Sequence, residues 1–232
     1  MTEARPVLLF DFFGTLVDYQ SDRNELRYPR SFEYFQQFDV AASYEQFVSC
    51  WSAAFEPLER VAHQTGVEFQ MGDVAQNVVR RLQLELDDRE LEQLIAAYMA
   101  DWSADIQPVT GAAGLLRSLG NHYRLGLISN THHPPTVMRL VDTFGFGGLF
   151  ETITLSAESG FAKPHPRMFE ETLKKMGVEP ADAVYIGDNF EADYRGSRAA
   201  GLDSYLIGRH ARVPRDRQLR NVQDLLIVFN IP

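Results

Sequence analysis

The sequence contains one cysteine, Cys50, among 232 residues. A single thiol cannot form an internal disulfide, and the sequence gives no sign of an oxidising compartment. Cys50 falls within an apolar pattern of helical spacing, which predicts a buried side chain rather than a nucleophile. A disulfide-stapled scaffold is therefore excluded.

Long hydrophobic runs are also missing. No segment approaches about 18 apolar residues in a row, the length that a membrane span needs. The first six residues lack the apolar stretch of a signal peptide. We therefore expect a cytoplasmic protein without a membrane partner.

Positive charge is scarce, because 22 Lys and Arg residues face 32 Asp and Glu residues, for a net charge of −10. A chain with this balance is a poor partner for nucleic acid or for an anionic membrane. A small phosphorylated substrate is compatible with it, since one local cluster of cations suffices. We therefore expect a small-molecule substrate and no nucleic acid.

The first strand pattern is the apolar run at residues 7–10, which leads into Asp11 and a turn at Gly14 and Thr15. An apolar run without alternation is typical of a strand buried on both faces of a parallel sheet. Ligands bind just beyond the carboxyl ends of such strands. Asp11 therefore stands where chemistry is usually carried out, although an Asp can also simply cap a turn.

The next ninety or so residues have a helical pattern. Apolar side chains recur every three or four residues over 44–61, 74–86 and 91–102, and residues 18–40 are polar with interleaved aromatics. The aromatic stripe predicts the core of a helix bundle rather than a ligand site.

From residue 108 onward, strand and helix patterns alternate. This order predicts an α/β fold with a doubly wound parallel sheet, which the first strand must join to be covered. We expect an α/β core from residues 1–17 and 106–232 and an inserted α-helical cap from residues 18–105. The expected strands are 123–128, 152–155, 183–186 and 204–207, and the expected helices are 111–119, 134–144, 166–176, 191–200 and 222–229.

Polar residues collect at the ends of the expected strands or just beyond them. Each one alone could cap a helix, form a turn or lie in solvent. Because the carboxyl ends of parallel strands meet at one edge of a sheet, their coincidence favours a functional site. The residues are Asp11, Ser129, Asn130, Lys163, Asp188 and Asp193.

These side chains suit phosphoryl chemistry around a metal ion. Asp11 and Asp188 are hard oxygen ligands of the kind that Mg²⁺ takes, and Asp193 could hold a metal-bound water or orient Lys163. Clustered carboxylates repel one another unless a cation neutralises them. Ser129 can donate to a phosphoryl oxygen, Lys163 can neutralise developing charge, and Asp11 is free to attack as a nucleophile.

The same residues resemble the four motifs of the haloacid dehalogenase (HAD) superfamily. The motifs are residues 11–16 (DFFGTL), Ser129, Lys163 followed by Pro164, and residues 187–193 (GDNFEAD). Their order, their strand context and the helical insertion between the first two motifs match over nearly the whole chain. The resemblance implies a Rossmann-like hydrolase core with a small helical cap and with Mg²⁺ as cofactor.

The resemblance also assigns roles to individual residues. It implies that Asp11, Ser129 and Lys163 are catalytic. The implied substrate-binding residues are Phe13, Gly14, Thr15 and Asn130, and the implied metal ligands are Asp11, Asp188, Asp193 and the backbone carbonyl of Phe13.

Position 13 departs from the phosphatases of this superfamily. They carry a second Asp two residues after the nucleophile, which protonates the leaving group and then activates water. Phe13 cannot transfer a proton, and losing general acid–base help typically costs about 10²–10⁴-fold in rate. The superfamily's dehalogenases have an aromatic Tyr at this position and use no metal. However, Asp188 and Asp193 without Mg²⁺ would repel an anionic haloacid.

The favoured hypothesis is a Mg²⁺-dependent phosphoester or phosphoanhydride hydrolase that acts on a small metabolite through an aspartyl-phosphate at Asp11. Such an enzyme could use substrates with good leaving groups, such as acyl phosphates, or borrow an acid from the cap or from His132 or His133.

Two alternatives remain open. The first is a 2-haloacid dehalogenase-like hydrolase. Arg23, Arg27 and Arg30 lie in the region of the dehalogenases' carboxylate-binding arginine, but a solvated helix surface explains them equally well. The second is a weakly catalytic or non-catalytic protein that binds a metabolite. The sequence does not identify the substrate, and it is compatible with a monomer or a homodimer.

Overall fold

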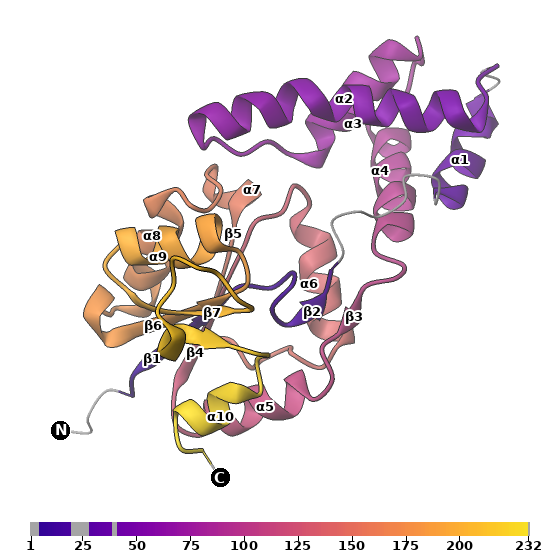
Figure 1. Cartoon of the computed structure of the whole chain (residues 1–232). Coiled ribbons are helices and arrows are strands. Elements are labelled where there is room, and N and C mark those ends of the chain that lie inside the picture. Colours follow the sequence, from indigo (N-terminus) through magenta and orange to yellow (C-terminus); the bar gives the residue numbers. More distant parts are fainter. Residues whose placement is uncertain (1–4, 20–27, 39–40, 232) are drawn as a thin grey trace. The chain divides into compact units, whose positions relative to one another are not determined.

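The computed structural model describes residues 5–19, 28–38 and 41–231. The chain divides into two compact units, one made of residues 1–19 and 107–232 and the other of residues 20–106. Figure 1 traces both along the chain. The first, the core unit, is α/β, and the regular elements described in the second, the cap unit, are helices. The predicted fold class, an α/β protein with an inserted helical cap, is confirmed.

A six-stranded parallel sheet forms the core unit, in the order β5-β4-β1-β6-β7-β8. In the register of the central strand β1, Phe10 lies beside Leu127 of β4 and Ile186 of β6. This central place explains why all four residues of β1 are buried. The strands are β1 (Val7–Phe10), β4 (Arg124–Ser129), β5 (Thr152–Leu155), β6 (Ala183–Gly187), β7 (Asp203–Ile207) and β8 (Gln218–Leu219).

Helices cover both faces of this sheet. Met168, Phe169 and Leu173 of α8 share a buried cluster with Val7 and Leu9 of β1. Figure 1 shows α8 and α9 on one side of the sheet and α5 and α10 on the other, so the sheet is doubly wound as expected. The helices are α5 (Ala112–Gly120), α6 (Pro134–Thr143), α8 (Pro166–Met176), α9 (Gly196–Ala199) and α10 (Asp224–Val228).

Two helices of the cap unit begin with side-chain caps. Ser43 forms a capping box with Gln46, and Asp87 forms another with Glu90, so the first backbone N–H groups of two helices are satisfied. None of the described helices is long and apolar enough to cross a membrane. The elements are α1 (Pro29–Phe35), the 3₁₀ turn η1 (Gln36–Phe38), α2 (Tyr44–Thr65), α3 (Met71–Arg81) and α4 (Asp88–Trp102).

Aromatic rings form much of the cap unit's interior. The ring of Tyr98 stacks on Tyr28 at 4.6 Å and on Trp51 at 4.0 Å between ring centroids. Cys50 is also buried, beside the carbonyl of Val78. The aromatic stripe is therefore helix-bundle core, and Cys50 fills space within it, as the sequence pattern predicts.

Several short elements differ from the sequence-based expectation. The ends of the insertion pair as antiparallel strands β2 (Val17–Asp18) and β3 (Gln107–Pro108), which are too short to give a periodic pattern. The expected helix at 191–200 is instead a π-helix, η3 (Phe190–Arg195), that continues into α9. The short helix α7 (Ser156–Ser159), the turns η2 (Pro180–Asp182) and η4 (Arg215–Arg217), and strand β8 were not expected, and the expected helix at 222–229 is only α10.

Truncation of Leu94 tests the packing of the cap unit. Leu94 is fully buried, so Leu94→Ala should lower the free energy of unfolding of this unit by about 2–5 kcal/mol. Val61→Ala is the control, because Val61 is 53% exposed and its truncation should change stability by less than about 0.5 kcal/mol. Both tryptophans, Trp51 and Trp102, lie in the cap unit, so urea unfolding followed by tryptophan fluorescence reports on it. Equal effects of the two variants would contradict the described core.

Candidate active site

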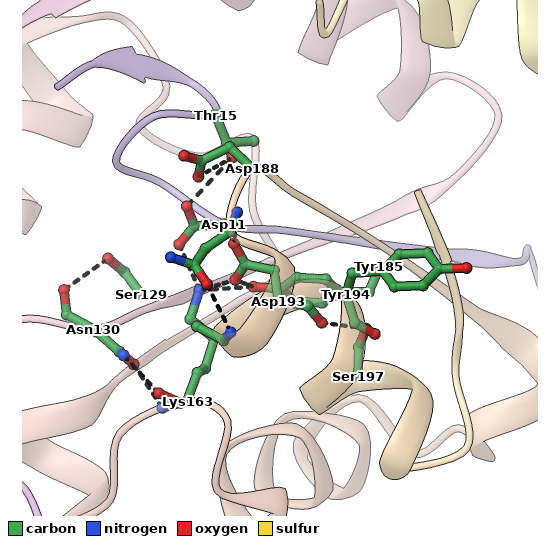
Figure 2. Close-up of polar contacts among 12 residues, drawn as sticks. Asp11, Thr15, Ser129, Asn130, Lys163, Tyr185, Asp188, Asp193, Tyr194 and Ser197 are labelled. Atoms are coloured by element: carbon green, nitrogen blue, oxygen red, sulfur yellow. Dashed lines mark hydrogen bonds and ion pairs between the residues drawn. The ribbon is translucent and has the colours of Figure 1, made fainter. Parts of the chain in front are cut away.

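The sheet brings the candidate residues to one edge. Asp11 directly follows the central strand β1, and its backbone N–H donates to the carbonyl of Ile186 in β6 at 2.8 Å. Ser129 ends β4, on one side of β1, and Asp188 follows β6, on the other. Because all three strands are parallel, these residues meet at the carboxyl edge of the sheet. Figure 2 shows them together with Lys163 and Asp193.

The ammonium of Lys163 makes three hydrogen bonds at the centre of the site. The Lys163 side chain is buried, and its ammonium donates to Asp11 Oδ1 at 2.5 Å and to Asp193 Oδ1 at 2.7 Å. A third bond goes to the hydroxyl of Tyr185 at 2.8 Å, and that hydroxyl donates onward to Asp193 Oδ1 at 3.0 Å. One cation therefore links the end of β1 with β6 and η3.

Asn130 holds the backbone of Lys163. Its side-chain oxygen accepts from the Lys163 N–H at 2.8 Å, and its side-chain nitrogen donates to the Lys163 carbonyl at 3.0 Å. Two bonds to one residue fix the loop that precedes α8. The Asn130 amide, expected to bind substrate, thus serves here to position Lys163.

Three carboxylates gather around this lysine. One oxygen of each of Asp11, Asp188 and Asp193 lies within 4.8 Å of the others. The hydroxyl of Thr15 is 3.3 Å from both Asp11 Oδ2 and Asp188 Oδ1 and can donate to either. Asp11 and Asp193 are buried, whereas Asp188 is exposed.

Two glycines allow the carboxylates to approach the backbone so closely. Gly14 has a φ of +83°, and a Cβ there would lie 2.4 Å from Asp188 Oδ2. A Cβ on Gly187 would lie 2.4 Å from the carboxyl carbon of Asp193. Any larger residue at these positions would displace the carboxylates.

The electrostatics indicate a surplus of negative charge. Burial raises the pKa of Asp11 to about 8; Lys163 opposes this rise, and Asp193 and Asp188 add to it. Desolvation and the neighbouring Asp193 raise the pKa of Asp188 as well. Burial alone would lower the pKa of Lys163, but Asp11 and Asp193 raise it above its ordinary value. When all three carboxyl groups are ionised, the single ammonium leaves two of their negative charges uncompensated, and the raised pKa values of Asp11 and Asp188 reflect that repulsion together with burial.

This donor set fits a divalent cation. Carboxylate oxygens are the ligands that Mg²⁺ prefers, and a 2+ charge equals the uncompensated charge of the group. Gly14 also favours a cation site, because the space it leaves lets the exposed carboxylate of Asp188 approach Asp11. Asp11 and Asp188 are the best candidates for direct ligands, since both oxygens of Asp193 already accept hydrogen bonds from Lys163 and from other residues of the site.

Ser129 and Phe13 complete the candidate site. Ser129 is fully buried, and within the described residues its hydroxyl makes one hydrogen bond, a long one of 3.4 Å to the Asn130 carbonyl. The Phe13 ring is half-buried and lies 4.9 Å from the ring of Phe12 and 5.4 Å from that of Tyr19, between centroids. Its side chain offers no proton to a leaving group.

Tyr185 is a site residue that the sequence analysis missed. It is fully buried, burial raises the pKa of its hydroxyl well above the usual range, and its partners are Lys163 and Asp193. A signal was available, because a Tyr in a buried central strand needs a partner for its hydroxyl. Asn189 was missed too, and its backbone N–H donates to Asp193 Oδ2 at 2.9 Å.

Other candidates from the sequence have different partners. A ring nitrogen of His133 pairs with the hydroxyl of Thr136 at 2.9 Å, and burial lowers the pKa of this imidazole. Arg30 lies in α1 of the cap unit, 4.0 Å from the carboxylate of Asp101. Arg23 and Arg27 fall outside the described residues.

The fold and the site define an α/β protein with a carboxylate group at the carboxyl edge of its parallel sheet and with an inserted helical unit. A sequence model of haloacid dehalogenase-like hydrolases matches residues 6–201, so the chain belongs to this family. The family assignment made from the four motifs is thereby confirmed.

Named relatives and solved structures agree with this assignment. Over 117 residues, the chain is 34% identical to the glyceraldehyde 3-phosphate phosphatase of Methanothermobacter thermautotrophicus, and the match covers 50% of each chain. The chain thus spans about half the length of the curated relatives it matches. Two solved structures share its fold over 97% of the chain: a 2-haloacid dehalogenase from Pseudomonas syringae (TM-score 0.73, 19% identity) and a HAD phosphatase from Thermococcus onnurineus (TM-score 0.65, 19% identity).

Replacement of Gly14 by Ala should weaken the binding of a divalent cation. The new Cβ would displace Asp188, and losses in such supporting contacts typically weaken metal binding by about 10–100-fold. Gly148→Ala is the matched control, because Gly148 also has a positive φ, +73°, but its Cβ would meet nothing within 4 Å. Calorimetric titration with MgCl₂ measures both. Equal weakening in both variants would show that backbone strain, rather than displacement of Asp188, accounts for the loss of Mg²⁺ affinity.

Proposed function

We propose that the protein is a Mg²⁺-dependent phosphohydrolase that acts on a small phosphorylated metabolite, with Asp11 as the nucleophile. The observation that carries this proposal is the group of three carboxyl groups around Lys163, which in their ionised form carry two more negative charges than the ammonium balances. An anionic substrate can approach Asp11 only when a cation neutralises that surplus.

The residues present would hold Mg²⁺ through Asp11, Asp188 and the backbone carbonyl of Phe13, with Asp193 beside them. When bound, the ion would neutralise the carboxylates and polarise the phosphoryl group. The other functions fall to the protein itself. Lys163 holds Asp11 through Oδ1, so the Oδ2 atom is the one left to react. Ser129 is in place to donate to a phosphoryl oxygen.

The reaction then proceeds in two displacements. An oxygen of Asp11 attacks phosphorus, the bond from phosphorus to the leaving oxygen breaks, and the leaving group departs with the electron pair. Water next attacks the phosphorus of the aspartyl-phosphate, which releases phosphate and restores the Asp11 carboxylate. The net reaction consumes one water and transfers its protons to the two products or to solvent.

Phe13 limits which leaving groups this enzyme can expel. A leaving oxygen that is weakly basic departs as an anion without a proton, whereas an ordinary alkoxide needs a general acid. No such acid is available from Phe13, so acyl phosphates, phosphoanhydrides and aryl phosphates are the favoured substrates. The phosphatase relative supports phosphoryl chemistry in general, and the helical cap, residues 18–105, is the part that we expect to select the substrate.

A dehalogenase is the second candidate, and one observation favours it. Two residues after the nucleophile the chain carries the aromatic ring of Phe13, packed against Phe12 and Tyr19, and a halide leaves without needing a proton donor there. The fold does not discriminate, because a dehalogenase and a phosphatase resemble this chain to a similar degree. The uncompensated carboxylates argue against an anionic haloacid and make phosphoryl transfer the better proposal.

Removal of the metal tests the proposal directly. Phosphate release from an aryl or acyl phosphate should require Mg²⁺ and stop in EDTA, and Asp11→Asn should abolish it while the circular dichroism spectrum stays unchanged. Halide release from 2-chloropropionate, measured on the same sample, should be absent in both conditions. Halide release that persists in EDTA would establish the dehalogenase instead, and no turnover of either kind would favour a binding role.

Substitution of Phe13 tests the proton-transfer argument. Phe13→Asp should raise the turnover of a phosphate ester with a basic leaving group, by up to about 10²–10⁴-fold. Phe13→Asn is the matched control, since the Asn side chain has nearly the same shape as that of Asp but cannot transfer a proton. Steady-state rates on an alkyl and an aryl phosphate should show the gain for Asp alone, and mainly for the alkyl ester. A similar gain from Asn would attribute the effect to the removal of the ring.

A further inference from the structure

The segment that follows β7 and includes β8, residues 208–220, is strongly basic. Residues 208–220 contain five arginines and one acidic residue, in a chain whose net charge is −10. Such a local reversal of charge is the electrostatic requirement for binding an anion. None of these residues belongs to the carboxylate group around Lys163.

The same segment surrounds a pocket of about 830 Å³. This volume lies within the range of small-molecule sites, about 300–1,000 Å³. Arg209, Arg215, Arg220 and His210 are among the residues that line it, and none of the lining residues is acidic. The pocket belongs wholly to the core unit.

The arginines of this segment differ in their partners. Arg212 is paired with Glu191 at 3.2 Å and Arg217 with Asp203 at 2.6 Å, so each has a carboxylate partner within the protein. In the described part of the chain, Arg209 and Arg215 have neither an ion-pair partner nor a side-chain hydrogen bond. Two uncompensated guanidinium groups therefore line the pocket.

The wall of the pocket is well ordered by hydrogen bonds. The side-chain nitrogen of Gln218 donates to the carbonyls of His210 at 3.1 Å and Val213 at 2.6 Å, and its oxygen accepts from the His210 N–H at 3.2 Å. The N–H of Gly208 donates to the Leu219 carbonyl at 2.8 Å. The loop is thus tied to strand β8, and little ordering is left for a ligand to induce.

An aromatic contact anchors the same wall to η3. The imidazole of His210 stacks on the ring of Phe190, 3.7 Å away and nearly parallel. Phe190 is the first residue of η3, the helix that also carries Asp193. The pocket wall and Asp193 are therefore both attached to η3, although the pocket shares no lining residue with the carboxylate group.

We propose that this pocket is a second anion site, which binds a small molecule that carries two linked phosphate groups. Guanidinium groups bind phosphate oxygens through paired hydrogen bonds, and two unpaired guanidiniums match two phosphates. The third arginine of the pocket, Arg220, is already paired with Asp224, so it contributes positive electrostatic potential rather than a free hydrogen-bond donor. The site is independent of the reaction proposed for Asp11.

Calorimetric titration in EDTA tests the site with phosphate, pyrophosphate and ADP as probes. Without a cation, the carboxylate group repels these anions, so binding reports on the arginine pocket. Arg209→Gln and Arg215→Gln should each weaken pyrophosphate binding by about 10-fold or more. Arg212→Gln is the matched control, because it removes the same charge from the same loop but does not line the pocket.

Each outcome has a clear meaning. Pyrophosphate binding that is lost in the two pocket variants and kept in Arg212→Gln supports the proposal, and tighter binding of ADP would identify an organic diphosphate as the preferred form. No binding, or equal weakening in all three variants, overturns it. A single-stranded RNA oligomer that binds more tightly than pyrophosphate and loses binding in the same variants would also overturn it, because the segment would then serve an extended polyanion.

Discussion

The buried ammonium of Lys163 is the interaction on which the rest of the site depends. It reaches Asp11 after β1, Tyr185 in β6 and Asp193 in η3, and so connects segments that are far apart in the chain. A buried charge of either sign is strongly unfavourable alone, and a buried ion pair is tolerated only when its remaining hydrogen bonds are satisfied. Tyr185 meets that condition, because its hydroxyl accepts the third hydrogen bond of the ammonium. Asn130 contributes separately by fixing the backbone from which Lys163 extends.

The π-helix η3 explains how Asp193 reaches this ammonium. The Tyr194 N–H donates to the carbonyl of Asn189, five residues earlier, at 3.1 Å, and the wider turn directs Asp193 inward. Asn189 stabilises the same turn from its start, since its side-chain oxygen accepts from the N–H groups of Glu191 and Ala192. The absence of a Cβ on Gly187 leaves the room that this carboxylate occupies.

The sequence predicted the parts of this arrangement that follow from strand order. Apolar runs ending at Asp11, Ser129 and Asp188 were enough to place those residues at one sheet edge, because parallel strands share a direction. The partners of Lys163 could not be predicted in the same way. Tyr185 looks like any core residue until its hydroxyl is located, and a π-helix has the same composition as an α-helix. Two-residue strands such as β2 and β8 carry no periodic signal at all.

The charge of the site and the missing proton donor at Phe13 each restrict which substrates the proposed reaction can use. Two like charges about 4 Å apart repel by about 4 kcal/mol at an effective dielectric constant of about 20, so each uncompensated carboxylate is a substantial barrier to an anionic substrate. A divalent cation removes this barrier but does nothing for a basic leaving group, which still lacks a proton donor. The substrates that satisfy both conditions are phosphate compounds whose leaving oxygen is stable as an anion. In the proposed reaction, Asp188 and Asp193 would therefore select for phosphoryl transfer, and Phe13 would select among the phosphoryl donors.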